Sequence, residues 1–237
     1  KGLIHSNFSS NSNWPYSNWS AFVPAPASLT NANFQTAVNL WCSDKAAAFA
    51  TYGHIKDWNV TGVTNMANAF YNKTNFDDNI TGWDVSNVTN MNSMFRDSSA
   101  FNQPIGDWNT SSVNKVDYMF YGASTFNQPI GDWDMSSAQN MADMFNRASS
   151  FNHPIGNWDT SSVTKMNYMF YAADSFNQDI SDWNVSAVTN MTNIFLNANA
   201  LSNTNKGLIH SSFSSNSNWP YDWSAFVNTP PPNQTGD

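Results

Sequence analysis

Hydrophobic residues recur along this chain every 25 residues, without an insertion, from residue 55 to residue 204. The repetition is carried by a Trp row, an Ile row and two Phe rows. These rows are Trp58, Trp83, Trp108, Trp133, Trp158 and Trp183; Ile55, Ile80, Ile105, Ile130, Ile155 and Ile180; Phe70, Phe95, Phe120, Phe145, Phe170 and Phe195; and Phe76, Phe101, Phe126, Phe151 and Phe176, closed by Leu201. A unit this short cannot bury its own apolar face, whereas stacked units bury a continuous core. The pattern therefore predicts six stacked repeats with the aromatic rows inside.

The spacing of apolar residues changes halfway through each unit. Trp83 and Val85 alternate with polar neighbours, which is typical of a strand, whereas the later V-x-x-M-x-x-M-F run has the spacing of a helical or 3₁₀ turn. One strand and one turn per unit predict an α/β solenoid, a leucine-rich-repeat-like right-handed coil with one parallel β-sheet. A row of asparagines after the second Phe row predicts a ladder of amides that satisfy turn backbone groups. This row is Asn102, Asn127, Asn152 and Asn177.

Two nearly identical segments flank the repeats, because residues 206–227 repeat residues 1–23. The second copy stands where a C-terminal cap belongs, so we expect the first to be the cap of a preceding module in a tandem array. A Pro-rich joint, extended and semi-rigid, follows each copy. The predicted organisation is 1–23 as the C-terminal cap of a preceding module, 24–29 as a linker, 30–54 as an N-terminal helical cap, 55–204 as the six-repeat solenoid, 205–227 as the C-terminal cap and 228–237 as a Pro-rich linker. In the N-terminal cap we expect Thr30 or Asn31 to begin a helix and Gly53 to end its second part.

Composition narrows the function classes. The net charge of −8 argues against nucleic acid, since phosphate binding needs a basic face. No apolar run reaches the roughly 18 residues of a membrane span, so no membrane insertion is expected. All 17 acidic residues are Asp, which together with abundant Asn and Ser favours tight turns over long helices. The single cysteine, Cys42, cannot form an internal disulfide, so no disulfide framework marks secretion.

The repeat resembles that of the BspA-like leucine-rich-repeat surface proteins. The resemblance is carried by units such as Ile105-Gly106-Asp107-Trp108-Asn109-Thr110-Ser111-Ser112-Val113 and Met166-Asn167-Tyr168-Met169-Phe170, and it covers residues 55–204. It implies an extracellular, cell-surface protein used in adhesion or host and matrix contact. It brings no catalytic residues and names no ligand.

The residues beside each Trp are candidates for a binding face, because neighbours of an inward-pointing residue on a strand point outward. The candidates are Asp57, Asn59, Asp84, Asp107, Asn109, Asp132, Asp134, Asp159, Asp182 and Asn184. One interpretation is a solvated polar face that limits aggregation. The other is a glycan or calcium site, centred on Asp107, Asp132, Asp134 and Asp159, since hard cations bind several carboxylate and carbonyl oxygens; no 12-residue calcium loop is present.

Several Asn-x-Ser/Thr sequons are candidates for glycosylation, although a chain this rich in Asn, Ser and Thr produces them by chance. They include Asn7, Asn18, Asn72, Asn79, Asn87, Asn190 and Asn233.

No catalytic motif is recognisable. The four histidines form no H-x-x-x-H pair, and there is no G-x-S-x-G, P-loop or G-x-G-x-x-G. Paired aspartates keep a glycosidase formally open, but an active site usually breaks a repeat and none is broken by an insertion. We therefore expect no enzyme and no cofactor, with calcium the one alternative. The expected function is an extracellular structural or adhesion module of a tandem-repeat surface or filament protein, binding protein, above all copies of itself. The alternative is a glycan- or calcium-binding lectin-like module that uses the Asp/Asn face.

Overall fold

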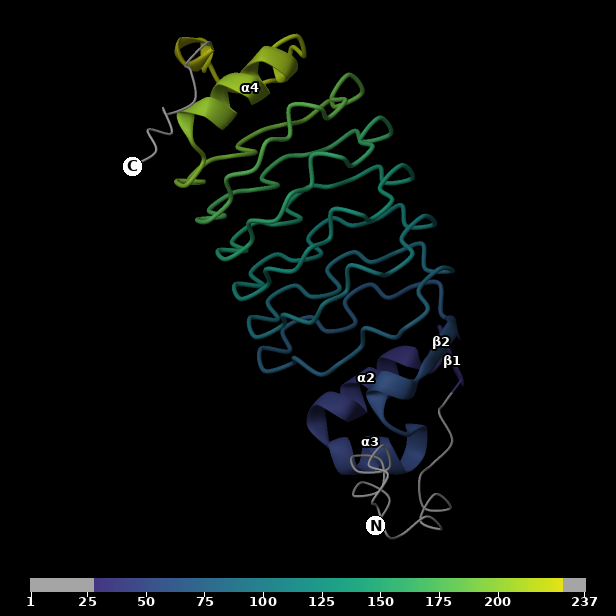
Figure 1. The fold of residues 1–237 in the computed structure, drawn as a ribbon. Helices are drawn as coiled ribbons and strands as arrows, with labels where there is room; N and C mark the ends of the chain where they lie inside the picture. Colours follow the sequence, from purple (N-terminus) through teal and green to yellow (C-terminus); the bar gives the residue numbers. More distant parts are fainter. Residues whose placement is uncertain (1–27, 228–237) are drawn as a thin grey trace, which may run out of the picture.

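The computed structural model describes residues 28–227. Figure 1 shows irregular coils stacked between a helical segment at each end. We number the six 25-residue units as coils one to six, with coil one at residues 55–79 and coil six at residues 180–204. The predicted preceding cap, residues 24–27 of the first predicted linker and the whole of the linker 228–237 lie outside the described residues. Residues 28 and 29, predicted as linker, belong to a strand.

The N-terminal end of the stack is closed by two helices and a short parallel pair. β1 (Ser28–Thr30) pairs with β2 (Asn59–Gly62), and α2 (Phe34–Ser43) and α3 (Lys45–Tyr52) lie between them in the chain. α2 buries Phe34, Val38 and Trp41, whose spacing places them on one face. α2 begins after Asn33, so the expectation that Thr30 or Asn31 caps it was wrong. α3 ends at Tyr52, and Gly53 follows it with a φ of 76°, a backbone conformation that favours glycine.

The C-terminal end is closed by α4 (Asn203–Phe213) and by an aromatic segment that follows α4 in the chain. The Ser202 hydroxyl accepts a hydrogen bond from Asn205 N at 3.2 Å and so caps the helix. A 3₁₀ turn at Ser224–Phe226 approaches α4 so closely that a Cβ on Gly207 would lie 2.2 Å from the Phe226 carbonyl oxygen. The Tyr221 hydroxyl accepts a hydrogen bond from Phe195 N, and the rings around it cover coil six.

The coils are joined by a ladder of backbone hydrogen bonds in the Met-containing half of each unit. Between coils one and two, the N–H groups of Met66, Asn68, Phe70 and Asn72 donate to carbonyl groups of Asn90, Asn92, Met94 and Arg96, at 2.8–2.9 Å. The same four donors recur at every later interface except that between coils three and four, which has three. Isolated parallel bridges mark this line from Asn65 through Asn90, Lys115, Asn140 and Lys165 to Asn190.

The ladder depends on a backbone that alternates in handedness. The peptide groups between the ladder bonds close tight turns, such as Ala69 N to Met66 O at 3.1 Å and Tyr71 N to Asn68 O at 3.1 Å. Two residues per coil have positive φ, for example Asn68 and Asn72 at 58°. Because these turns alternate with left-handed residues, the segment does not continue as a helix, and every ladder N–H points towards the next coil.

The position of the parallel pairing is a correction to the prediction. In coils two to six the Trp-containing half, such as residues 83–85, forms no strand, and in coil one it contains only β2, which pairs with the cap. The Met-containing half forms the ladder instead of a helical turn. The reason is that turns with three-residue spacing place Val and Met inside as a helix would, so the sequence pattern favoured a helix. The assignment to a leucine-rich-repeat-like right-handed solenoid stays a prediction.

The aromatic rows form columns inside the stack. Successive rings of the first Phe row, from Phe70 to Phe195, stack at centroid distances of 5.5–5.7 Å. Within a coil the two Phe rows also meet, as Phe95 does with Phe101 at 3.8 Å. All these rings are buried, so burial and stacking stabilise the contact between neighbouring coils.

The predicted asparagine ladder is present and structural. Asn127 N donates to Asn102 Oδ1 at 2.9 Å, Asn152 N to Asn127 Oδ1 at 3.0 Å, and Asn177 N to Asn152 Oδ1 at 2.8 Å. Asp77 supplies the same acceptor to Asn102 N. Each amide therefore satisfies a backbone N–H in the next coil, which would otherwise lack a partner.

The Trp row offers a matched test of one buried hydrogen bond. Trp133 Nε1 donates to Ile105 O at 3.0 Å, whereas the buried Nε1 of Trp108 has no partner. Trp133→Phe should lower the free energy of unfolding by about 1 kcal/mol more than Trp108→Phe, because only the first change removes a buried hydrogen bond. The Ile105 carbonyl keeps its backbone bond from Trp108 N at 3.2 Å in both variants. Urea denaturation followed by circular dichroism measures the difference. Equal losses in the two variants would show that this bond adds nothing to stability.

Candidate functional site

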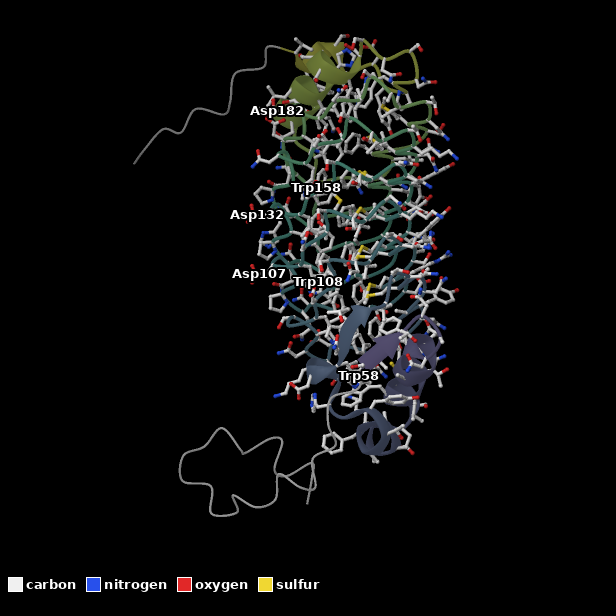
Figure 2. The ribbon with its side chains drawn as sticks, turned by 90° about the vertical axis from the view of Figure 1, so that its right-hand side faces the viewer. Trp58, Asp107, Trp108, Asp132, Trp158 and Asp182 are labelled. Atoms are coloured by element: carbon white, nitrogen blue, oxygen red, sulfur yellow. The ribbon has the colours of Figure 1, made fainter. Side chains whose placement is uncertain are left out.

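The predicted Asp/Asn face is exposed and regular. Every residue flanking a Trp in this row is exposed, while the Trp side chains are buried. Figure 2 shows Asp107, Asp132 and Asp182 along one side of the stack, beside the line of Trp58, Trp108 and Trp158. The structure thus brings the candidates together as a row, as the repetition requires.

The residue after each Trp already has a structural role. Asp134 Oδ1 accepts from Ser136 N at 2.9 Å and from Ser136 Oγ at 2.6 Å. Asp159 bonds Ser161 N in the same way, and hydrogen bonds from Ser161 lower the pKa of Asp159. The equivalent turn is formed by Asn59, Asp84, Asn109 and Asn184. The choice of Asp or Asn here is explained by turn formation.

The proposed metal candidates do not form a metal centre within residues 28–227. No group of three or more Asp, His or Cys residues in this part of the chain is arranged to hold an ion. Asp107, Asp132, Asp134 and Asp159 follow one another along the row, without a convergent set of ligands. The calcium interpretation stays an untested prediction.

The asparagine side chains of the sequons differ in their exposure and in the hydrogen bonds that they form. Asn72 and Asn79 are exposed, whereas Asn87 Nδ2 donates to Thr61 O at 3.0 Å in the coil before it. Asn79 Oδ1 and Asn190 Oδ1 accept backbone N–H groups of their own turns, at 3.0 Å each. Asn7, Asn18 and Asn233 lie outside the described residues.

His54, His210 and Cys42 lie in the two caps. His210 Nδ1 accepts a hydrogen bond from Trp219 Nε1 at 3.0 Å, and the His54 ring lies 5.1 Å from the Trp41 ring. Burial lowers the pKa of His54 and raises the pKa of the half-buried Cys42 thiol. A raised thiol pKa disfavours the thiolate, so Cys42 is a poor nucleophile.

A second surface, in the Met-containing half of the coils, gathers tyrosine and arginine. It holds five of the eight tyrosines and both arginines of the chain. We call it the Tyr/Arg surface, and it comprises Tyr71, Arg96, Tyr118, Tyr121, Asp143, Asn146, Arg147, Tyr168, Tyr171 and Leu196. Most of these residues line a shallow hollow of about 610 Å³. Tyr71 and Leu196, at its two ends, are among the most exposed large apolar side chains of residues 28–227.

Arg96 is held by aromatic rings. Its guanidinium carbon lies 4.8 Å from the Tyr121 ring centroid, 5.2 Å from that of Tyr118 and 5.5 Å from that of Tyr71. Its Nε is buried without a hydrogen-bond partner and lies 3.6 Å from Asp97 Oδ2. Rings on several sides restrict the rotamers of the side chain, so it is ordered before any ligand arrives.

Asp143 is a buried member of the Tyr/Arg surface, at 7% exposure. It accepts hydrogen bonds from Asn146 Nδ2 at 2.7 Å and from the Tyr118 hydroxyl. Burial nevertheless raises the pKa of Asp143, and burial together with Asp143 raises the pKa of Tyr118. The surface therefore contains charges of both signs, with a carboxyl group whose charged form is disfavoured.

Strained backbone positions are used by residues of this surface. Tyr118, Arg147 and Tyr168 have φ of 57–59°. Non-glycine residues rarely adopt this region, and Asn and Asp tolerate it best. Coils one and six place Asn at the equivalent positions, which are Asn68, Asn72, Asn193 and Asn197.

The sequence pattern did not predict the Tyr/Arg surface, because the residues that the repeats share dominate that pattern. The available signal was departure from the repeat. The position of Tyr71 holds arginine, tyrosine, asparagine, tyrosine and leucine in the following coils, at Arg96, Tyr121, Asn146, Tyr171 and Leu196. Such variation in an otherwise regular array marks positions at which stacking does not require a particular residue type.

Comparison with known families finds one match. A family model described as "Mycoplasma protein of unknown function, DUF285" matches residues 39–153 and again residues 129–229. Searches of curated proteins and of solved structures found no match. The two matched ranges together include all six coils and most of both caps. The resemblance to BspA-like proteins stays a prediction.

The helices of residues 28–227 are all too short or too polar to cross a membrane.

The raised pKa of Asp143 predicts a pH dependence of stability. Between the ordinary value of 3.8 and the raised folded-state pKa, the folded chain holds a proton that the unfolded chain has lost, so the contribution of Asp143 to stability falls as pH rises through this window. Asp143→Asn keeps an Oδ1 acceptor and stays neutral, so this loss should shrink. Urea midpoints measured at a series of pH values test it.

Asp159→Asn is the matched control with the opposite sign. Hydrogen bonds from Ser161 lower the pKa of Asp159, so its contribution is present above 3.8 and is lost as pH falls through the lowered pKa. This variant should reduce the acid-side loss of stability instead. An unchanged pH profile in Asp143→Asn would contradict the assignment.

Proposed function

The chain belongs to the DUF285 family, and we propose that it is an extracellular structural or adhesion module of a tandem-repeat surface or filament protein. It acts by holding protein partners, with further copies of itself as the first partner to test. It is not an enzyme and needs no cofactor. The Tyr/Arg surface is the part of the molecule that makes this contact.

The composition of the Tyr/Arg surface supports a protein partner. Tyrosine and arginine dominate the residues that carry binding energy in protein interfaces, and charged groups of both signs surround them here. A nucleic-acid partner would need an excess of basic groups, whereas Asp97 and Asp143 lie close to Arg96. Rings that hold Arg96 in place lower the entropy lost on binding.

The observation that carries the proposal is the use of costly backbone positions. An L-residue in the left-handed region costs roughly 1–2 kcal/mol, and Asn bears it better than Tyr or Arg. Tyr118, Arg147 and Tyr168 nevertheless occupy such positions in the middle of the array. These residues lower the stability of the stack, so stability does not explain their presence. Binding is the requirement that we propose explains it.

The dimensions of the surface fit a protein partner as well. It extends from Tyr71 in coil one to Leu196 in coil six, which is five coil spacings or roughly 24 Å if neighbouring coils lie about 4.8 Å apart. A standard interface covers about 800 Å² on each partner, a patch of this width.

The proposal predicts which substitutions abolish binding. The double variant Arg96→Ala with Tyr121→Ala should weaken binding at least tenfold, because it removes the ordered guanidinium and the ring nearest to it. Binding is measured by biolayer interferometry against the chain itself, fibronectin, collagen and fibrinogen, with albumin as the non-partner. Sedimentation velocity reports self-association.

Asp107→Asn with Asp132→Asn is the matched control, since both residues are exposed on the Asp/Asn row. It should leave binding unchanged. Loss of binding in this control, with retention in the Arg96/Tyr121 variant, would assign function to the Asp/Asn row and contradict the proposal. Absence of binding to every protein in the panel, including the chain itself, would also contradict it.

A further inference from the structure

A second groove lies on the ladder side of coils two to four, apart from the hollow of the Tyr/Arg surface. Its volume is about 420 Å³, within the range of small-molecule sites. We call it the amide groove, and its lining includes Asn90, Asn114, Lys115, Asp117, Gln139 and Asn140. Four of these six side chains are carboxamides.

The repeat is broken where this groove lies. In coils one, two, five and six, the position of Gln139 is threonine: Thr64, Thr89, Thr164 and Thr189. In coils two, five and six the threonine hydroxyl donates to a carbonyl of the preceding coil, at 3.1–3.2 Å. Coils three and four carry Asn114 and Gln139 instead, whose side chains form no hydrogen bond within residues 28–227. The side-chain bond that threonine makes between coils is thus absent at both places, although the backbone N–H groups of Asn114 and Gln139 still donate to the preceding coil.

Gln139 is unusual among the glutamines of the described residues. Gln103, Gln128 and Gln178 each donate from Nε2 to a residue of the preceding coil, at 2.8–3.0 Å. Gln35 donates to Ala69 O at 3.1 Å. These amides serve the stack, whereas the exposed Gln139 amide is left to face solvent.

The groove offers donors and acceptors together. Asn90 and Asn140 use Oδ1 to accept N–H groups of their own turns, at 3.0 and 3.1 Å, and keep Nδ2 as a donor. Asn114 and Gln139 keep both a donor and an acceptor. Lys115 adds a positive charge, and Asp117, half-buried and held by Asn92 Nδ2, adds a carboxylate. Their opposite charges disfavour an ion of either sign as the ligand.

We propose that the amide groove binds a neutral saccharide of two or three hexose units. Sugar hydroxyls donate and accept at once, which matches unpaired carboxamides better than it matches a surface of one charge. The groove spans two coil spacings, roughly 10 Å, which is the length of a disaccharide. Asp117 supplies an acceptor for a pair of adjacent hydroxyls. This site is independent of the protein contact proposed above.

The repeat itself supplies the test variant. Asn114→Thr with Gln139→Thr installs the residue that four other coils use, so the variant should fold and should be at least as stable as the parent chain. Saturation-transfer NMR is run with maltotriose, cellotriose, mannotriose and chitotriose. We expect transfer to at least one of them, with affinity reduced at least tenfold in the double variant and binding to protein partners unchanged.

Asn157→Ala is the matched control, because Asn157 is exposed in the Trp-containing half of coil five and its side chain forms no hydrogen bond with the described residues. It should bind the saccharide like the parent chain. Transfer to none of the four saccharides, or equal affinity in the Thr variant, would overturn the proposal. A blocked triglycine peptide is titrated in parallel, and binding of this peptide without any saccharide would reassign the groove to an extended polypeptide.

Discussion

The one-directional backbone ladder is the constraint on which the rest of the structure depends. Each coil donates N–H groups at alternate positions to carbonyls of the next coil, and this requires two left-handed residues per coil. An insertion or deletion of one residue would turn the donors of a coil away from the acceptors of the next. The constant length of the repeat over six coils follows from this geometry. Hydrophobic burial supplies the driving force, and the ladder fixes the register in which the rings stack.

The fixed register turns every position of the unit into a row, and each row has a role that can be tested against its contacts. The Phe and Trp rows are core, the Asn102 row bonds the next coil, and the row after Trp forms turns. Where all members of a row make the same contact, stability accounts for the residue. Where some members of a row lack the shared contact, as Asn114 and Gln139 do in the threonine row, stability does not account for these residues. This distinction separates structural polar residues from binding residues in an array where every polar residue recurs.

The sequence predicted the repeat length, the buried rows, the exposure of residues beside Trp and the asparagine ladder, because each follows from side-chain pattern alone. The backbone ladder was misplaced because alternating handedness has no sequence signature comparable to that of a helix or strand. Its left-handed positions are filled by Asn, Asp and Ser but also by Tyr118, Arg147 and Ala172, in place of a row of glycines. The Val and Met spacing therefore looked helical. The Tyr/Arg surface was missed because its residue types vary along each row, so no shared residue marks it in the repeat.

Both proposed surfaces centre on the middle coils, and the ends of the stack explain why. Coil one must match the N-terminal cap, where Ala69 O accepts from Gln35, and coil six must match the C-terminal cap, where Phe195 N donates to Tyr221. Middle coils have a coil on each side and are stabilised by two interfaces, so they tolerate a lost hydrogen bond or a strained φ at less risk of local unfolding. Asn114, Tyr118, Gln139, Arg147 and Tyr168 all lie in coils three to five. The stack thus tolerates destabilising residues best in its middle coils. A partner bound there also has regular coils on both sides of its contact.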